Sequence, residues 1–182
     1  MSYYIKEVEK EDLRDFMYVN TNSWNESYRG IVSDDFLNII MDKIDSNTER
    51  LENKFDQEKE NEPYNKRFIL YVDEEPVGVL GIDKSRDEKY PNSGELTCLY
   101  LLNKAKKQGY GKIMFDKAEE ELIKQGFTDM IIDCLKENPT NEFYKHMGGQ
   151  LVSEKARNIG GKEYPVNIYY FDKLIKTNKR PI

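Results

Sequence analysis

The sequence lacks paired cysteines and long apolar runs, and each absence excludes a class of protein. Its 182 residues include two cysteines, Cys98 and Cys134, which have no C-x-x-C spacing and are too few for a disulfide scaffold. We expect both to be small buried side chains on strands. No apolar run approaches the ~20 residues that a bilayer-spanning helix needs. We therefore expect no membrane partner.

Basic residues are also in deficit. The formal net charge is −6, whereas nucleic-acid binding requires a basic face. We therefore expect no nucleic-acid partner, while a cationic small substrate is compatible with this charge. His146 is the only histidine and no cluster of metal ligands is visible, so we expect no metal. The first twelve residues lack the apolar core of a signal peptide, and we expect a cytoplasmic protein.

The overall composition is typical of a globular domain. Charged residues make up 34%, hydrophobic residues 38% and aromatic residues 12% of the chain. That aromatic content is typical of a packed core and not of a disordered segment. The length suits one domain over residues 1–182.

Hydrophobic periodicity predicts an α/β (α+β mixed) fold, with a central mixed sheet of about six to seven strands flanked by about four helices. Strand patterns occupy residues 3–8, 67–72, 77–82, 95–102, 130–135, 150–157 and 163–170. Helical patterns occupy residues 13–27, 34–44 with Ser33 as its cap, 47–61 as an exposed helix or a mobile extension, 110–125 and 138–147. The helix 110–125 between two apolar strands predicts a parallel crossover.

The most informative segment is the turn between the strand 95–102 and that long helix. It reads Lys106-Lys107-Gln108-Gly109-Tyr110-Gly111 and is followed by Lys112. A helix N-terminus offers unpaired backbone N–H groups and a positive dipole end, and glycines let a phosphate approach the backbone. A P-loop needs Gly-Lys-Ser or Gly-Lys-Thr, and a dinucleotide fingerprint needs a third glycine, so both are excluded. A βα turn with solvated lysines stays open.

A strand, a K-x-x-G-x-G turn and a helix resemble the coenzyme-binding motif of the GNAT superfamily of N-acetyltransferases, written Q/R-x-x-G-x-G/A. Lys106 stands in place of the usual Gln or Arg. Lysine keeps the positive charge of arginine but lacks its planar guanidinium. The segment from Asn138 to Gly149 is similar to the family's N-P-x-x-x-F-Y-x-x-x-G-G block. The segment from Trp24 to Gly30 is a looser match to W-x-x-x-Y-x-G. The resemblance covers nearly the whole chain, with a coenzyme-binding core at about 93–150.

The resemblance implies that acetyl-CoA is the co-substrate. Its pantetheine arm is expected to lie along the strand, with a main-chain N–H near Leu101 facing the thioester oxygen. Asn138 is expected to contact the coenzyme or to order its loop as a helix cap. The coenzyme-binding residues implied in this way are Leu99, Tyr100, Leu101, Lys106, Lys107, Gln108, Gly109, Tyr110, Gly111, Lys112, Asn138 and Tyr144.

Two side chains are candidates for catalysis. Tyr144 stands where the family has a tyrosine that protonates the departing thiolate, and a neutral phenol can do so at pH 7. Glu95 opens the central strand and is the candidate base, acting through water, with Asp133 as a weaker candidate. The alternatives are that Tyr144 only packs and that Glu95 is a solvated strand-end carboxylate. Trp24, Tyr28 and Arg29 are candidates for acceptor contacts.

The resulting functional hypothesis is an N-acetyltransferase that moves an acetyl group from acetyl-CoA directly to a primary amine of a small molecule. A protein N-terminal or lysine acetyltransferase stays open as an alternative. A non-catalytic acetyl-CoA sensor or regulatory module, from a different class, stays open too. If the chain forms a homodimer, the closing strands 150–157 and 163–170 are the expected contact.

Overall fold

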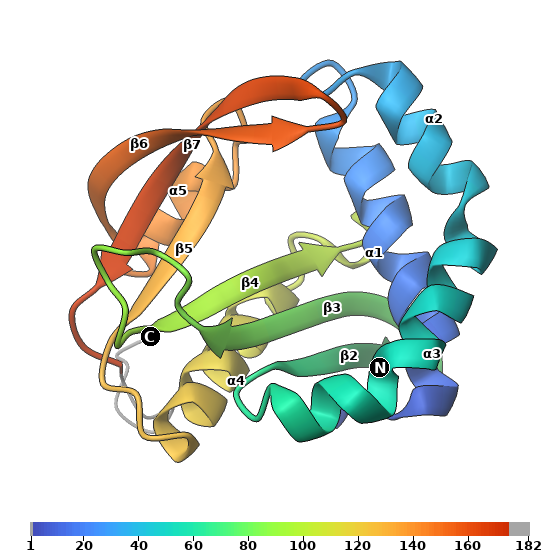
Figure 1. The fold of residues 1–182 in the computed structure, drawn as a ribbon, viewed down its shortest axis with the longest axis horizontal. Coiled ribbons are helices and arrows are strands. Elements are labelled where there is room, and N and C mark those ends of the chain that lie inside the picture. The colour runs from blue at the N-terminus through green and yellow to red at the C-terminus, as the bar shows by residue number, and fades with distance from the viewer. Residues whose placement is uncertain (1, 175–182) are drawn as a thin grey trace.

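In the computed structural model, which describes residues 2–174, one mixed sheet of seven strands is combined with five α-helices (Figure 1). The strands are β1 Tyr3–Glu7, β2 Lys66–Val72, β3 Glu75–Lys84, β4 Gly94–Leu101, β5 Met130–Leu135, β6 Gln150–Ile159 and β7 Lys162–Phe171. The α-helices are α1 Leu13–Tyr28, α2 Asp34–Asp42, α3 Ile44–Asn61, α4 Tyr110–Lys124 and α5 Asn141–His146. Two 3₁₀ turns, η1 Lys10–Asp12 and η2 Asn103–Ala105, precede α1 and the turn before α4.

The sheet forks between β4 and β5. The strand order is β1-β2-β3-β4-β5-β7-β6, and β4–β5 is the parallel pair that the α4 crossover requires. This pairing covers only three positions, Gly94↔Met130, Glu95↔Ile131 and Leu96↔Ile132. Beyond it, β4 stays paired with β3 and β5 stays paired with β7, so the two strands diverge (Figure 1). The fork leaves one side of the second half of β4 without a neighbouring strand.

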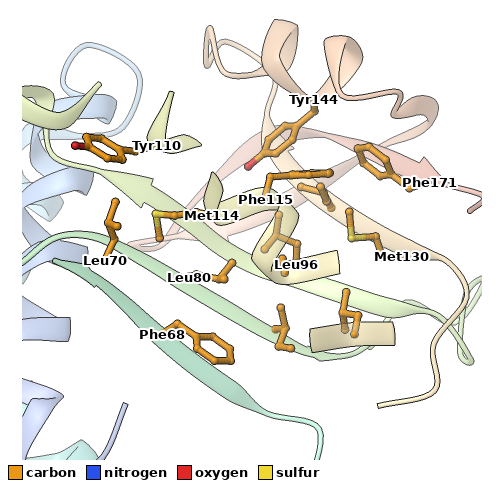
Figure 2. Close-up of a cluster of buried hydrophobic side chains, with 14 of the residues drawn as sticks. Phe68, Leu70, Leu80, Leu96, Tyr110, Met114, Phe115, Met130, Tyr144 and Phe171 are labelled. Atoms are coloured by element: carbon orange, nitrogen blue, oxygen red, sulfur yellow. The ribbon is translucent and has the colours of Figure 1, made fainter. Parts of the chain in front are cut away.

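Helices cover both faces of the sheet. On one face, α4 and α5 enclose the largest hydrophobic cluster, in which Phe68, Met114, Phe115 and Met130 are almost wholly buried (Figure 2). On the other face, α1 and α3 pack on β2 and β3 through Leu13, Phe16, Val19, Phe55, Ile69 and Val79. A third cluster joins the end of α1 and α2 to β7.

A β-bulge at Thr97 sets which side chains of β4 point to which face. Gly81 pairs with Cys98 and the next residue, Ile82, pairs with Leu96, so Thr97 is the extra residue. A Cβ on Gly81 would lie 2.6 Å from Thr97 Oγ1, which explains the glycine. Leu96 joins the α4 cluster, whereas Cys98 packs with the α1 cluster.

The expected elements are confirmed, with differences at their ends. Residues 47–61 belong to the helix α3, which begins three residues earlier and buries Phe55 against α1. The short helix α5 begins at Asn141 and not at 138, because Asn138 Oδ1 accepts from the Thr140 amide and holds a turn there. Ser33 does precede α2, but its side chain makes no cap, and its amide donates to Tyr164 Oη at 3.0 Å. Across residues 2–174, none of the helices is both long and apolar enough to cross a membrane.

Candidate functional site

Three tyrosines from three elements lie around the fork. Tyr144 comes from α5, Tyr100 from β4 and Tyr28 from the last turn of α1. Burial raises the pKa of Tyr144 well above 10, and the nearby Cys134 and Tyr28 raise it further. The phenol of Tyr144 is therefore neutral at physiological pH. Its ring lies between Phe143 and Tyr169, at centroid distances of 5.5 and 6.0 Å, and it belongs to the cluster of Figure 2.

Tyr28 and Tyr100 form an aromatic group with Trp24. The hydroxyl oxygens of Tyr28 and Tyr100 are 3.2 Å apart. The Trp24 ring meets the edge of Tyr28 at 4.8 Å and that of Tyr100 at 6.2 Å between centroids. Burial raises the pKa of Tyr28 to about 12, although hydrogen bonds with Tyr100 and with Asn138 lower it. The group thus connects α1, β4 and the loop after β5.

The turn before α4 has the backbone geometry of an anion site. Gly109 is the N-cap residue with φ +88°, and Lys107 also has a left-handed φ of +61°. The amides of Lys112 and Ile113 both donate to Gly109 O, at 3.1 and 3.2 Å. The amides that precede them in the helix have no intrahelical acceptor and are available to a ligand.

Space at Gly111 is consistent with a bulky ligand. A Cβ there would meet Phe143 at 3.7 Å and Leu101 at 3.9 Å, which is ordinary contact. The fold therefore does not require a glycine at position 111. A phosphate that approaches the α4 N-terminus does benefit from one, because the backbone is then unshielded.

The basic side chains of this turn are partly engaged elsewhere. Lys106 Nζ donates to Ser27 Oγ at 3.1 Å, which ties the turn to the end of α1. Lys112 Nζ pairs with Asp116 at 2.7 Å along α4. Lys107 is exposed. The main-chain amides at the start of α4 are therefore less engaged with neighbouring groups than Lys106 and Lys112 are.

Asn141 is a structural residue of the site that the sequence analysis did not identify. Its Nδ2 donates to the carbonyl oxygens of Leu135, Lys136 and Asn138, at 2.8, 3.2 and 2.6 Å. Its Oδ1 accepts from Asn167 Nδ2 at 2.8 Å and from Tyr169 Oη at 2.9 Å. This buried side chain anchors the start of α5, one turn before Tyr144, to β5 and β7. The second Asn in the 138–149 block was its only signal.

The acidic candidates are both paired with arginines. Glu95 is buried, and Arg86 Nη2 donates to its Oε1 at 3.0 Å. Asp133 Oδ2 accepts from Arg157 Nε at 2.7 Å. The structure thus places Glu95 in an ion pair and not at a solvated strand end.

Arg29, a candidate for acceptor contacts, and the single histidine lie away from the fork. Arg29 is exposed and points to α2, where it bonds Asn38 Oδ1 at 2.7 Å and pairs with Asp34. His146 is exposed at the end of α5. Among residues 2–174, no group of three His, Cys, Asp or Glu side chains is arranged to hold a metal ion.

Comparison with known proteins identifies the family. The sequence model of the acetyltransferase (GNAT) family matches residues 14–148. The chain is 27% identical over 158 residues to the uncharacterised N-acetyltransferase YuaI of Bacillus subtilis (strain 168), covering 86% of each protein.

Solved structures share the fold. One is the PaiA N-acetyltransferase from Thermoplasma acidophilum in complex with coenzyme A, with a TM-score of 0.68 and 22% identity over 92% of this chain and 98% of that one. Another is yncA from Salmonella typhimurium with its cofactor acetyl-CoA, with a TM-score of 0.67 and 10% identity over 96% of this chain and 95% of that one. The forked sheet, the left-handed turn before α4 and the family match agree, and the chain belongs to the GNAT family of acetyltransferases.

Proposed function

We propose that the protein transfers an acetyl group from acetyl-CoA directly to a primary amine of a small, positively charged molecule. The observation that carries this proposal is the position of a neutral, buried phenol, Tyr144, beside the open side of β4 in a chain of the GNAT family. The family assignment indicates acetyl transfer, and the open side of β4 is where we propose that it occurs.

The residues of the fork fit acetyl-CoA. The second half of β4, including Leu99, Tyr100 and Leu101, has an edge that an extended pantetheine arm can pair with. The left-handed turn at Gly109 and the unshielded backbone at Gly111 suit the pyrophosphate. When bound, acetyl-CoA supplies an acetyl group activated as a thioester. A main-chain N–H near Leu101 is the candidate donor to the oxygen on which negative charge develops.

Tyr144 is the proposed general acid. In the overall reaction a C–N bond replaces a C–S bond, the amine loses a proton and the sulfur gains one. Burial keeps the pKa of Tyr144 well above 10, while a free thiol titrates near ~8.5. A phenol with a pKa above that of the thiol holds its proton in the resting site and delivers it only as the thiolate departs.

The acceptor must become neutral before it reacts. An alkylamine with a pKa of about 10.4 lies about 3.4 units above pH 7, so its deprotonation costs about 4.6 kcal/mol. Glu95 is the proposed acceptor of that proton, through water. It lies in the part of β4 that pairs with β5, one residue before the last paired position, on the strand that also carries Tyr100. Its pairing with Arg86 means that its environment must change when the acceptor binds.

The end of α1 is the proposed wall of the acceptor site. Trp24 and Tyr28 present aromatic surface beside Tyr100, and such surface attracts ammonium groups through cation–π contacts. The net charge of −6 favours the approach of a cation over long range. Arg29, which points to α2, is proposed to support this wall and not to contact the acceptor.

A thiol-release assay with acetyl-CoA tests the proposal. The panel contains spermidine, tyramine, an aminoglycoside, free amino acids and lysine-containing peptides, each with a no-acceptor control. Turnover of a small amine is the expected result. Turnover of peptides alone would assign the protein-acetyltransferase alternative instead. Tight binding of acetyl-CoA with no turnover of any amine would assign the sensor alternative.

A further inference from the structure

The side chains of Glu95 and Arg86 differ sharply in exposure. The Glu95 side chain is 8% exposed, and the Arg86 side chain is 74% exposed. Burying a carboxylate without a cation or hydrogen-bond donors is strongly unfavourable. Glu95 therefore requires a positive partner, and an arginine that lies mostly in solvent supplies it.

Glu95 has one fixed partner and one exchangeable partner. Its Oε2 accepts from the main-chain amide of Arg86 at 3.1 Å. Its Oε1 accepts from the guanidinium Nη2 of the same residue at 3.0 Å. A side chain can rotate away while its backbone stays in place. Departure of the guanidinium would leave the main-chain bond intact and free one carboxylate oxygen for another cation.

The loop that carries Arg86 is held by its neighbours and not by the guanidinium. The buried carboxylate of Asp87 pairs with Lys155 of β6. The Asp87 amide donates to Ser85 Oγ at 3.1 Å. The Tyr90 ring stacks on Tyr170 of β7 at 4.9 Å between centroids. These contacts fix the backbone at position 86, so the Arg86 side chain can exchange without unfolding of the loop.

Further carboxylates surround the guanidinium. Asp83 pairs in register with Glu95 on the neighbouring strand β3. Burial raises the pKa of Asp83, while the Lys84 amide and the charge of Arg86 lower it. The hydrogen bond and the charge of Glu95 raise the pKa of Arg86, and Asp83 and Asp133 add to that effect. Asp83 and Glu95 thus place two carboxylates at paired positions of neighbouring strands beside the guanidinium, which favours a cation there.

Glu95 also lies next to the vertex of the fork. Glu95 pairs with Ile131 of β5, one residue before the last paired position, Leu96↔Ile132. The end of α1 contacts the same strand further along, at Tyr100. A cation that replaces the guanidinium would be held two residues before the part of β4 that has an open edge.

We propose that Arg86 is an internal competitor of the acceptor: the ammonium group of a primary alkylamine displaces its guanidinium from Glu95 Oε1, and Glu95 then holds that acceptor. This inference rests on the proposed function and specifies its acceptor as a cation that enters by exchange. It makes Arg86 a specificity-determining residue, because an acceptor without a positive charge cannot displace it.

The test compares Arg86→Ala with wild type, using the best amine of the panel. We expect the KM for that amine to fall at least threefold in Arg86→Ala, with no fall in kcat and no change in the KM for acetyl-CoA. Lys89→Ala, which removes a positive charge from the same loop without touching Glu95, is the matched control and should leave the KM for the amine unchanged. An unchanged or higher KM for the amine in Arg86→Ala would overturn the proposal.

Added guanidinium ion distinguishes competition from a structural effect. At 10 mM it should raise the KM for the amine in Arg86→Ala toward the wild-type value and leave the wild-type KM unchanged. In an Arg86→Ala/Glu95→Gln double variant, the fall in the KM for the amine and its response to guanidinium should both vanish. The carboxylate for which the amine, Arg86 and guanidinium compete is then absent. A guanidinium effect of the same size in wild type and in Arg86→Ala would contradict the exchange.

A binding arm keeps the inference separate from the proposed function. If wild type turns over no amine of the panel, the proposed function fails. Calorimetric titration of spermidine into the coenzyme A complexes of wild type and Arg86→Ala then decides the inference alone. At least threefold tighter binding to Arg86→Ala supports exchange at Glu95, and equal or weaker binding rejects it.

Discussion

The hydroxyl groups of Tyr28 and Tyr100 lie 3.2 Å apart and join the last turn of α1 to the open part of β4. The two residues are 72 positions apart in the sequence. Lys106 makes a second link, from the turn before α4 to Ser27 on the same helix turn. The end of α1 is therefore attached to both the strand and the turn that we propose to hold acetyl-CoA, so that acceptor and coenzyme sites share one rigid support.

A double-mutant cycle measures the Tyr28–Tyr100 link. Each single change to Phe leaves the other hydroxyl in a buried place without its partner, and we expect each to lower the free energy of unfolding by about 1–2 kcal/mol at neutral pH. Tyr28→Phe should cost more, because it also loses the Asn138 contact. The double variant should cost about 1 kcal/mol less than the sum, as measured by urea denaturation. Strict additivity would show that the two hydroxyls do not stabilise each other.

Alkaline pH should destabilise the protein through its buried tyrosines. Burial raises the pKa of Tyr28 to about 12 and the pKa values of Tyr100 and Tyr144 well above 10. In the unfolded chain these phenols ionise near ~10. The stability they contribute is fully present below pH 10 and is lost as the pH rises toward the folded pKa values. Each tyrosine should lower the free energy of unfolding by about 1.4 kcal/mol per pH unit in that window.

Urea denaturation between pH 9 and pH 11.5, with tyrosinate absorbance recorded in parallel, measures this loss. Tyr28→Phe is the matched variant, because Phe does not ionise in either state. Its stability should fall less steeply above pH 10 than that of wild type, by the contribution of one tyrosine. An identical slope in the two proteins would mean that Tyr28 ionises in the folded state.

Tyr144→Phe tests the proposed general acid. We expect kcat to fall at least tenfold, because the departing thiolate loses its proton donor. The KM for acetyl-CoA should change little, since Phe keeps the ring contacts with Phe143 and Tyr169. Steady-state kinetics with the best amine of the panel provides the measurement. Tyr169→Phe is a useful comparison, because it removes a buried hydroxyl that donates to Asn141 Oδ1 and does not act on the reacting sulfur. Full activity of Tyr144→Phe would assign the proton to solvent.

Most elements of the fold could be predicted from the sequence because their signals are local. The apolar run Met130–Leu135 has the same first and last residues as β5. The apolar side chains of α4 follow the 3.6-residue period of a helix. The turn at Gly109 was recognisable from its two glycines between a strand and a helix, and the left-handed φ of Gly109 accounts for the first of them. The predicted start of α5 was wrong because the Asn138 side chain accepts a hydrogen bond from the Thr140 amide, which forms a turn in place of the first helical residues.

The arrangement of the site could not be predicted in the same way, because it depends on contacts between distant segments. Nothing local distinguishes Tyr28 and Tyr100 from the other tyrosines of the chain. Glu95 was recognisable as an acid on the central strand, but its partner Arg86 lies in a polar loop with other charged residues. The fork itself follows from a register that stops after Leu96↔Ile132, and periodicity within one strand carries no information on the register between two.

Gly111→Asp separates the fold from coenzyme binding. Position 111 is the second residue of α4, where an acidic side chain interacts favourably with the helix dipole. A Cβ there meets only ordinary contacts with Phe143 and Leu101. We therefore expect thermal stability that is equal to or higher than that of wild type. The same carboxylate would lie where we propose the pyrophosphate, so affinity for coenzyme A should fall at least tenfold in calorimetry.

Gly111→Ala is the matched control for this change. It adds the Cβ without the charge, and its affinity for coenzyme A should stay closer to wild type than that of Gly111→Asp. The difference between the two variants should shrink at high salt, because screening weakens repulsion between exposed charges. Stable Gly111→Asp protein with wild-type affinity would place the pyrophosphate away from the α4 N-terminus. Gly109 is less suitable for the test, because its φ of +88° strains any substituted residue and would mix folding with binding.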